Sequence, residues 1–172
     1  TSQPKAFDEP IPKFLKMANK PFLARLGFSR DTKKLYAVDR LGISVYSVPD
    51  LAIINSLKFE GEFGEYDNRP GEVKESPDGK YLILTTGNTI RAYSTINLKP
   101  IWEKQLNYKT YDGYLQFSNN KVLVTTDSAA IVKINLYDLA DGRESLKANT
   151  SLRTNAGVAM VGNLVAFSSD QY

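Results

Sequence analysis

The sequence contains neither cysteine nor histidine among its 172 residues. Without cysteine, the chain forms no disulfide, thiolate nucleophile or cysteine-based zinc site. Without histidine, it lacks both a Ser-His-Asp triad and the commonest side-chain ligand of transition metals. These absences favour a non-catalytic protein, and we expect no cofactor and no metal site. They leave the compartment open, because cytoplasmic proteins and disulfide-free exported proteins share them.

Long hydrophobic runs are also missing, since no apolar stretch approaches the roughly 18 residues of a membrane helix. Hydrophobic residues make up 42% and charged residues 24% of the chain, as in an ordinary globular domain. The net charge is only +3, and no basic stripe is interleaved with aromatic residues, so we expect no nucleic-acid partner. Residues 60–78 depart from this balance with 7 acidic and 2 basic side chains.

What the sequence does contain is a repeat of about 44 residues. The stretch "SRDTKKL" from Ser29 and the stretch "SPDGKYL" from Ser76 share Ser, Asp, Lys and Leu at a shift of 47 residues. "SNNKVL" at 118–123 is a third copy and "VGNLV" at 161–165 a fainter fourth. Further anchors recur in the same copies: Tyr46-Ser47, Tyr93-Ser94 and Tyr137-Asp138, then Asp39, Asp127 and Asp170, with Gly87 in the matching turn.

Each copy has the pattern of four short strands, because apolar, β-branched or aromatic runs alternate with turn residues. The first copy predicts strands at about 23–28, 34–39, 43–48 and 53–59. The second predicts about 72–76, 80–86, 89–95 and 100–106, and the third about 114–118, 121–127, 131–137 and 144–149. The fourth predicts about 157–161 and 164–169, where the chain stops. Only residues 11–20 have a pattern compatible with a short helix.

The segment "SPDGKYLILTTGNTIRAYS" resembles the YVTN and WD-repeat type of β-propeller blade, with its Ser-Pro-Asp-Gly turn followed by an apolar strand. The Tyr-Ser and Tyr-Asp pairs stand where WD repeats carry Trp-Asp. Gly-His, Trp-Asp and all histidines are absent, which favours the broader YVTN-like or quinoprotein-like group. The resemblance covers residues 23–172 and implies an all-β fold of four-stranded antiparallel blades. Residues 1–22, rich in proline, are then an N-terminal arm or linker.

Three and a half blades fall short of the usual ring of roughly 4–8 blades. We therefore expect the chain to be the front part of a seven- or eight-bladed ring. Either a missing C-terminal segment of a longer chain or a second chain would complete it. The unpaired edge of a half-built blade favours such pairing.

The resemblance implies a functional face formed by the loops between blades and the turns between the second and third strands. The loop at 60–71 is acidic and aromatic, and the loop at 107–113 carries tyrosines. Mixed aromatic and charged side chains suit protein recognition. The hypothesis is a non-catalytic interaction scaffold with a protein partner. Its candidate contacts are Glu62, Phe63, Glu65, Tyr66, Asp67, Arg69, Tyr108, Tyr111, Asp112, Asp39, Arg40 and Asp127.

Structural roles compete with this interpretation. The repeated aspartates, Asp39 among them, suit hydrogen bonds to backbone N–H groups in turns. The repeated tyrosines and Trp102 suit packing between blades. The acidic loop lacks the regular ligand spacing of a calcium loop.

Two other functions stay open from sequence. One is a lactonase-like or quinoprotein-like enzyme with its site at the central channel, for which Asp112, Asp127 and Arg153 are the candidates. The other is a structural segment of a larger secreted or cell-surface protein. Abundant tyrosine and asparagine without cysteine favour an exported bacterial protein, with the cytoplasm as the alternative.

Overall fold

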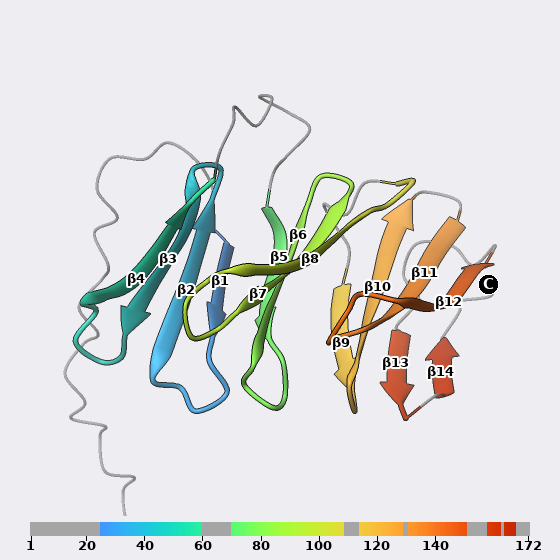
Figure 1. The fold of residues 1–172 in the computed structure, drawn as a ribbon. Helices are drawn as coiled ribbons and strands as arrows, with labels where there is room; N and C mark the ends of the chain where they lie inside the picture. The colour runs from blue at the N-terminus through green and yellow to red at the C-terminus, as the bar shows by residue number, and fades with distance from the viewer. Residues whose placement is uncertain are drawn as a thin grey trace, which may run out of the picture.

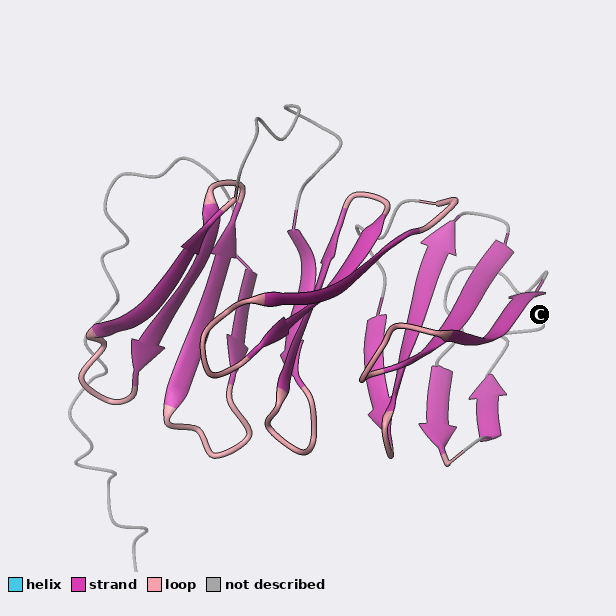
Figure 2. Ribbon diagram, viewed as in Figure 1, coloured by secondary structure: helices cyan, strands magenta, loops and turns pink. Residues whose placement is uncertain are grey.

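The computed structural model describes residues 25–59, 70–108, 114–128, 131–150, 158–162 and 164–167, and every regular element within these ranges is a β-strand (Figure 2). The strands form three four-stranded sheets and one two-stranded sheet. Sheet 1 contains β1 (Arg25–Phe28), β2 (Lys34–Asp39), β3 (Gly42–Ser47) and β4 (Ile53–Lys58). Sheet 2 contains β5 (Pro70–Glu75), β6 (Tyr81–Thr86), β7 (Thr89–Ser94) and β8 (Pro100–Gln105). Sheet 3 contains β9 (Tyr114–Ser118), β10 (Lys121–Ser128), β11 (Ile131–Asp138) and β12 (Glu144–Thr150), and sheet 4 contains β13 (Val158–Val161) and β14 (Leu164–Phe167).

Each sheet is an antiparallel meander in which consecutive strands are neighbours. Figure 1 shows the four sheets side by side in sequence order. The observed strand ends agree with the predicted ones within two residues. Residues 1–24, which include the expected arm and the possible helix, lie outside the described residues.

The turn after the first strand has the same hydrogen bonds in sheets 1 and 2. The Ser29 hydroxyl donates to Asp31 Oδ1 at 2.7 Å and accepts from the Lys34 backbone N–H at 2.8 Å. In sheet 2, the Ser76 hydroxyl donates to Asp78 Oδ1 at 2.6 Å and accepts from the Tyr81 N–H at 3.0 Å. The serine and aspartate shared by the two copies are therefore the residues that close this turn.

The turn after the third strand repeats in all three complete sheets. Its tightest position has a positive φ at Leu51 (56°), Leu98 (56°) and Gly142 (67°). The backbone N–H of each of these residues donates a 2.9 Å hydrogen bond to the carbonyl oxygen of the last residue in the preceding strand. These acceptors are Ser47, Ser94 and Asp138. Two leucines adopt a conformation that favours glycine, so the repeat imposes this backbone shape on unlike side chains.

The core lies between the sheets and not within a single sandwich. One apolar cluster joins sheet 1 to sheet 2 and includes Tyr36, Val38, Leu82 and Tyr93. A second joins sheet 2 to sheet 3, and a third joins sheet 3 to Met160 of sheet 4. Each four-stranded sheet thus buries apolar side chains by facing its neighbour in the stack, since burial of apolar area is the main favourable term in folding.

The first strands of successive sheets approach one another closely. A Cβ atom at Gly27 of β1 would lie 2.6 Å from the Val73 carbonyl oxygen of β5, so only glycine fits there. Farther along the stack, the Lys74 ammonium donates a 2.8 Å hydrogen bond to the Leu115 carbonyl, and Glu72 accepts one from the Leu115 N–H. Side chains of β5 thereby bind both the N–H and the C=O of Leu115. This residue lies on β9, the edge strand of sheet 3, whose outer edge has no partner strand in that sheet.

Candidate functional site

The candidate surface is the loop edge, defined as the end of the sheets that carries the β2–β3 and β6–β7 turns. The strands joined by residues 60–69, 109–113 and 151–157 also start or finish at this end (Figure 1). The face that the resemblance implied for function therefore exists as one edge of the stack. The opposite edge carries the serine-aspartate turns.

Most of the predicted contact residues cannot be placed on this edge. The following lie outside the described residues: Glu62, Phe63, Glu65, Tyr66, Asp67, Arg69, Tyr111 and Asp112. Arg153, the enzyme candidate, also lies outside them. Asp127 sits in β10 opposite Val132 of β11, with no description of its side chain. The partner contacts of all these residues stay predictions.

Asp39 closes the β2–β3 turn. Its Oδ1 accepts hydrogen bonds from the backbone N–H groups of Leu41 at 2.7 Å and Gly42 at 3.1 Å. This is the turn role considered for the repeated aspartates. Arg40 lies within the same turn at the loop edge, half-buried. Asp39 therefore shapes the turn that presents its neighbours at this edge.

Tyr108 is packed against sheet 3. Its hydroxyl donates to Oδ1 of the buried Asn135, whose amide donates in turn to Glu144. The Lys133 ammonium lies 5.3 Å from the centre of the Tyr108 ring, within cation–π range. Burial, with smaller contributions from the charges of Tyr137 and Glu144, raises the pKa of Tyr108. The sequence predicted a partner contact for Tyr108, which stays a prediction. In the structure its side chain ties the end of the segment after β8 to sheet 3.

Two exposed apolar side chains at the loop edge were missed from the sequence. Leu41, in the β2–β3 turn, is 56% exposed, and Tyr114, the first residue of β9, is 61% exposed. An apolar residue at a turn was the available signal for Leu41. Tyr114 is the first residue of a predicted strand, and nothing in the sequence indicated that its side chain is exposed. Both are side chains of the kind that protein interfaces bury.

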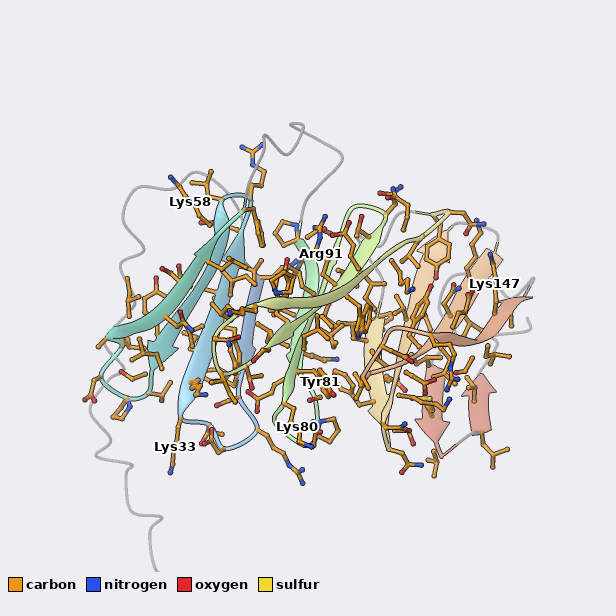
Figure 3. All side chains as sticks on the ribbon, in the orientation of Figure 1. Lys33, Lys58, Lys80, Tyr81, Arg91 and Lys147 are labelled. Atoms are coloured by element: carbon orange, nitrogen blue, oxygen red, sulfur yellow. The ribbon has the colours of Figure 1, made fainter. Side chains whose placement is uncertain are left out.

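A fixed pair of charges lies close to the same edge. Arg91 of β7 makes two contacts with the Glu103 carboxylate of β8, at 2.8 and 3.3 Å, and donates a third hydrogen bond to the Thr86 hydroxyl at 2.8 Å. Figure 3 shows Arg91 in sheet 2, whereas Lys33 and Lys80 project from the opposite edge. The bidentate geometry holds the guanidinium in one orientation.

A cavity of about 460 Å³ opens on the opposite edge, between the first turns of sheets 1 and 2. Its charged side chains include Arg30, Lys34 and Glu75. Glu75 accepts hydrogen bonds from the Arg30 N–H and from the Tyr36 hydroxyl, and the Arg30 guanidinium donates to the Pro77 carbonyl. The polar groups of this cavity thus bind one another across the two sheets, which gives the cavity a structural role.

Among the residues that the structure describes, no cluster of three or more acidic side chains is arranged to hold a metal ion. Within the same ranges, no helix is long and apolar enough to cross a membrane.

Comparison with known proteins gives a match in structure only. No protein-family model matches the sequence, and no curated protein matches it. Solved structures do: the RRP9 WD40 repeats superimpose with a TM-score of 0.66 at 12% identity, over 84% of this chain and 44% of that one. The chain has a β-propeller fold.

Two further solved structures match this chain. Kuenenia stuttgartiensis hydrazine synthase gives a TM-score of 0.65 at 18% identity, over 84% of this chain and 43% of that one. Kluyveromyces lactis Hsv2 gives 0.57 at 12% identity, over 86% and 43%. The sheets of this chain are therefore propeller blades, and the predicted fold class is confirmed. The chain spans less than half of each of these structures, and the number of blades in its ring stays a prediction, as does the closer YVTN-like assignment.

Proposed function

We propose that this chain is a non-catalytic protein-recognition module that binds its partner at the loop edge. The observation that carries the proposal is the pair of exposed apolar side chains there, Leu41 and Tyr114. They stand on rigid elements, because the Asp39 carboxylate holds the turn of Leu41 and the backbone pairing of β9 holds Tyr114. Preorganised apolar and aromatic groups beside charges are typical of interface anchors.

The WD40 fold supports this proposal at a coarse level, because such propellers serve as interaction scaffolds. The predicted contacts Tyr66 and Tyr111 belong to segments whose flanking strands end and begin at the loop edge. The partner surface would carry an apolar patch with acidic or polar groups around it, matching Leu41, Tyr114 and the half-buried Arg40.

The test is affinity capture with the full chain and matched variants. We expect a partner to be retained by the wild type and by Ile96→Asp, which changes an 86% exposed side chain in the β7–β8 turn on the opposite edge. Leu41→Asp, Tyr114→Asp and the double change of Tyr66 and Tyr111 to alanine should each lose that partner. Retention by all loop-edge variants, with loss in Ile96→Asp, would move the site to the opposite edge.

A second measurement separates recognition from catalysis. Elemental analysis and mass spectrometry of the purified chain should find no stoichiometric metal or quinone. A bound quinone or metal, together with partner binding that ignores the loop edge, would favour the channel enzyme with Asp112, Asp127 and Arg153.

A further inference from the structure

The fourth strand of sheet 2 places a lysine on the side that faces sheet 3. On β8, Lys104 lies opposite Ile90 of β7, whose side chain packs in the apolar cluster shared by sheets 2 and 3. Cross-strand partners lie on the same face of a sheet. Trp102, two residues before Lys104, also lies on this face, and its ring contacts Tyr137 of sheet 3. Lys104 therefore faces sheet 3.

Sheet 3 places two lysines on the side that faces sheet 2. Asn135 of β11 lies opposite Val124, which packs in the same apolar cluster, and Lys147 of β12 lies opposite Asn135. Lys133 is two residues from Asn135 and so shares its face. The contact of the Lys133 ammonium with the Tyr108 ring, in the segment after β8, agrees with this placement. Lys133 and Lys147 therefore face sheet 2.

The lysines of the two sheets also lie at a similar level along the strands. β8 ends at the loop edge and β11 begins there, so the two strands run in opposite directions. The rings of Trp102 and Tyr137 are in contact, with their centres 6.2 Å apart. Lys104 and Asn135 each lie two residues from this contact towards the loop edge, a distance of about 7 Å along a strand. Lys147, the partner of Asn135, thus lies at the level of Lys104.

Little negative charge balances these three residues, Lys104, Lys133 and Lys147, which we call the lysine junction. Among the described side chains of β8, β11 and β12 that face the junction, Glu144 has the one carboxylate, and it accepts a hydrogen bond from the Asn135 amide. Neither the Lys104 nor the Lys147 ammonium makes a hydrogen bond or ion pair within the described part of the chain. Lys104 is half-buried and Lys147 is exposed. Like charges on facing surfaces repel each other, and an anion between them would remove that repulsion.

The strands beside the lysine junction suit an extended ligand. β8 and β12 are the last strands of their sheets, and the outer edge of each has no partner among the strands that the structure describes. An extended peptide binds such an edge through main-chain hydrogen bonds, while its alternate side chains contact the surface beside it. Nucleic acid requires a longer basic patch than three lysines provide. Charge and backbone therefore both favour an acidic peptide.

We propose that the lysine junction binds an acidic segment of a partner protein in an extended conformation. Acidic side chains at alternate positions of such a segment point to one side, where they pair with Lys104 of sheet 2 and Lys147 of sheet 3. Lys133, which lies over the Tyr108 ring, adds a third positive charge towards the loop edge. The segment would thus bridge two neighbouring blades.

The test is the fluorescence anisotropy of a labelled peptide of alternating glutamate and threonine, about eight residues long, mixed with the full chain. We expect saturable binding that weakens with added salt. Lys104→Glu and Lys147→Glu should each weaken binding about tenfold, because each replaces an attraction by a repulsion. Lys58→Glu is the matched control, since it makes the same charge change on β4, the outer strand of sheet 1. Figure 3 shows Lys58 in sheet 1 and Lys147 in sheet 3.

Charge reversal of the peptide gives a second test. A peptide of alternating lysine and threonine should bind the double variant Lys104→Glu with Lys147→Glu more tightly than it binds the wild type. Lys104→Gln and Lys147→Gln repeat the first test should a glutamate variant lose its strand signal in circular dichroism. They should weaken binding of the acidic peptide less than the glutamate variants do.

Several results would overturn the proposal. They are a wild type that does not bind the acidic peptide, an equal loss in Lys58→Glu, and tighter binding of a single-stranded oligonucleotide that the same variants lose. Leu41→Asp and Tyr114→Asp should bind the peptide as the wild type does. Leu41 belongs to sheet 1, and Tyr114 precedes Leu115, which packs towards sheet 2, so the Tyr114 side chain lies on the other face. Failure at the lysine junction is therefore distinguishable from failure at the loop edge.

Discussion

The indole nitrogen of Trp102 in β8 donates a 2.7 Å hydrogen bond to the Leu139 carbonyl, in the turn after β11. The Trp102 side chain is buried, and its ring centre lies 6.2 Å from that of Tyr137. One directional bond inside an apolar cluster therefore joins the second blade to the third. The sequence-based prediction that Trp102 packs between blades is confirmed.

We expect Trp102→Phe to lower the free energy of unfolding by about 1–3 kcal/mol, because a buried carbonyl loses its donor. Urea denaturation measures this free energy. Circular dichroism is the signal to follow, because the variant lacks the chain's one tryptophan and so has no tryptophan fluorescence to report unfolding. Ile101→Ala on the same strand is the control: its side chain is 42% exposed, so a smaller loss is expected. Equal losses in the two variants would contradict a special role for the indole.

Gly142 is the second test of the same contact. A Cβ atom there would lie 2.7 Å from Cδ2 of Trp102, and its φ is +67°. Gly79 has a φ of +71°, but its Cβ would come no closer than 3.6 Å, to a Glu75 carboxylate oxygen. Gly142→Ala and Gly79→Ala thus share the backbone strain and differ in the clash. We expect Gly142→Ala to lower the melting temperature more, and a larger drop in Gly79→Ala would refute the contact.

Asp138 should make stability fall in acid. Burial opposes its ionisation, but hydrogen bonds from Lys121 and Arg143 outweigh burial and hold the pKa of the carboxyl below its usual value. Its contribution is therefore complete above the unfolded pKa of about 3.9 and is lost as pH falls through the lower folded pKa. Asp138→Asn should be less stable at pH 7, by about 1.5–3 kcal/mol.

Denaturation curves at pH 7 and pH 3 check this prediction. The difference between wild type and Asp138→Asn should narrow at the lower pH. Asp50→Asn, which changes an exposed turn residue, is the matched control and should leave the curves nearly unchanged. A constant difference across this range would show that the charge of Asp138 is not what stabilises the blade.

Tyr137 should make stability fall in alkali. Burial, aided by the negative charge of Glu144 and opposed by a hydrogen bond with Asn135, raises the pKa of Tyr137 to about 12. The unfolded value is about 10, so its contribution is complete below pH 10 and is lost as pH rises towards 12. Urea denaturation at a series of pH values across this interval should show a smaller loss of unfolding free energy in Tyr137→Phe than in the wild type. Tyr114→Phe, which changes an exposed ring, should follow the wild type.

The sequence was sufficient for the strands and their grouping into blades. Short apolar runs between turn residues are local signals, and the serine-aspartate turn at Ser76 closes through hydrogen bonds within a few residues. The repeat then fixed which strands belong together. The polar contacts between blades could not be predicted in this way, because Glu72 and Lys74 are ordinary charged residues until β9 lies beside them.

The candidate site was predictable in place but not in detail. The chain order of strands puts the 2–3 turns and the inter-blade loops at one edge, so the loop edge followed from the repeat. The environment of Tyr108 could not be predicted from the repeat. In the sequence, a loop tyrosine near charged residues has the same pattern whether it contacts a partner or Asn135. Leu41 and Tyr114 were missed because exposure depends on which neighbours the folded chain supplies.

By itself, the sequence determined the β-strand content, the four-strand unit and the turns that end each strand, because those depend on residues close together in the chain. Only the tertiary structure decided which faces are buried, which charges are paired and which apolar residues stay in contact with water. Burial and exposure depend on neighbours from other strands and other sheets. A contact such as that of Tyr36 with Glu75, roughly one repeat apart, forms only when whole sheets pack together.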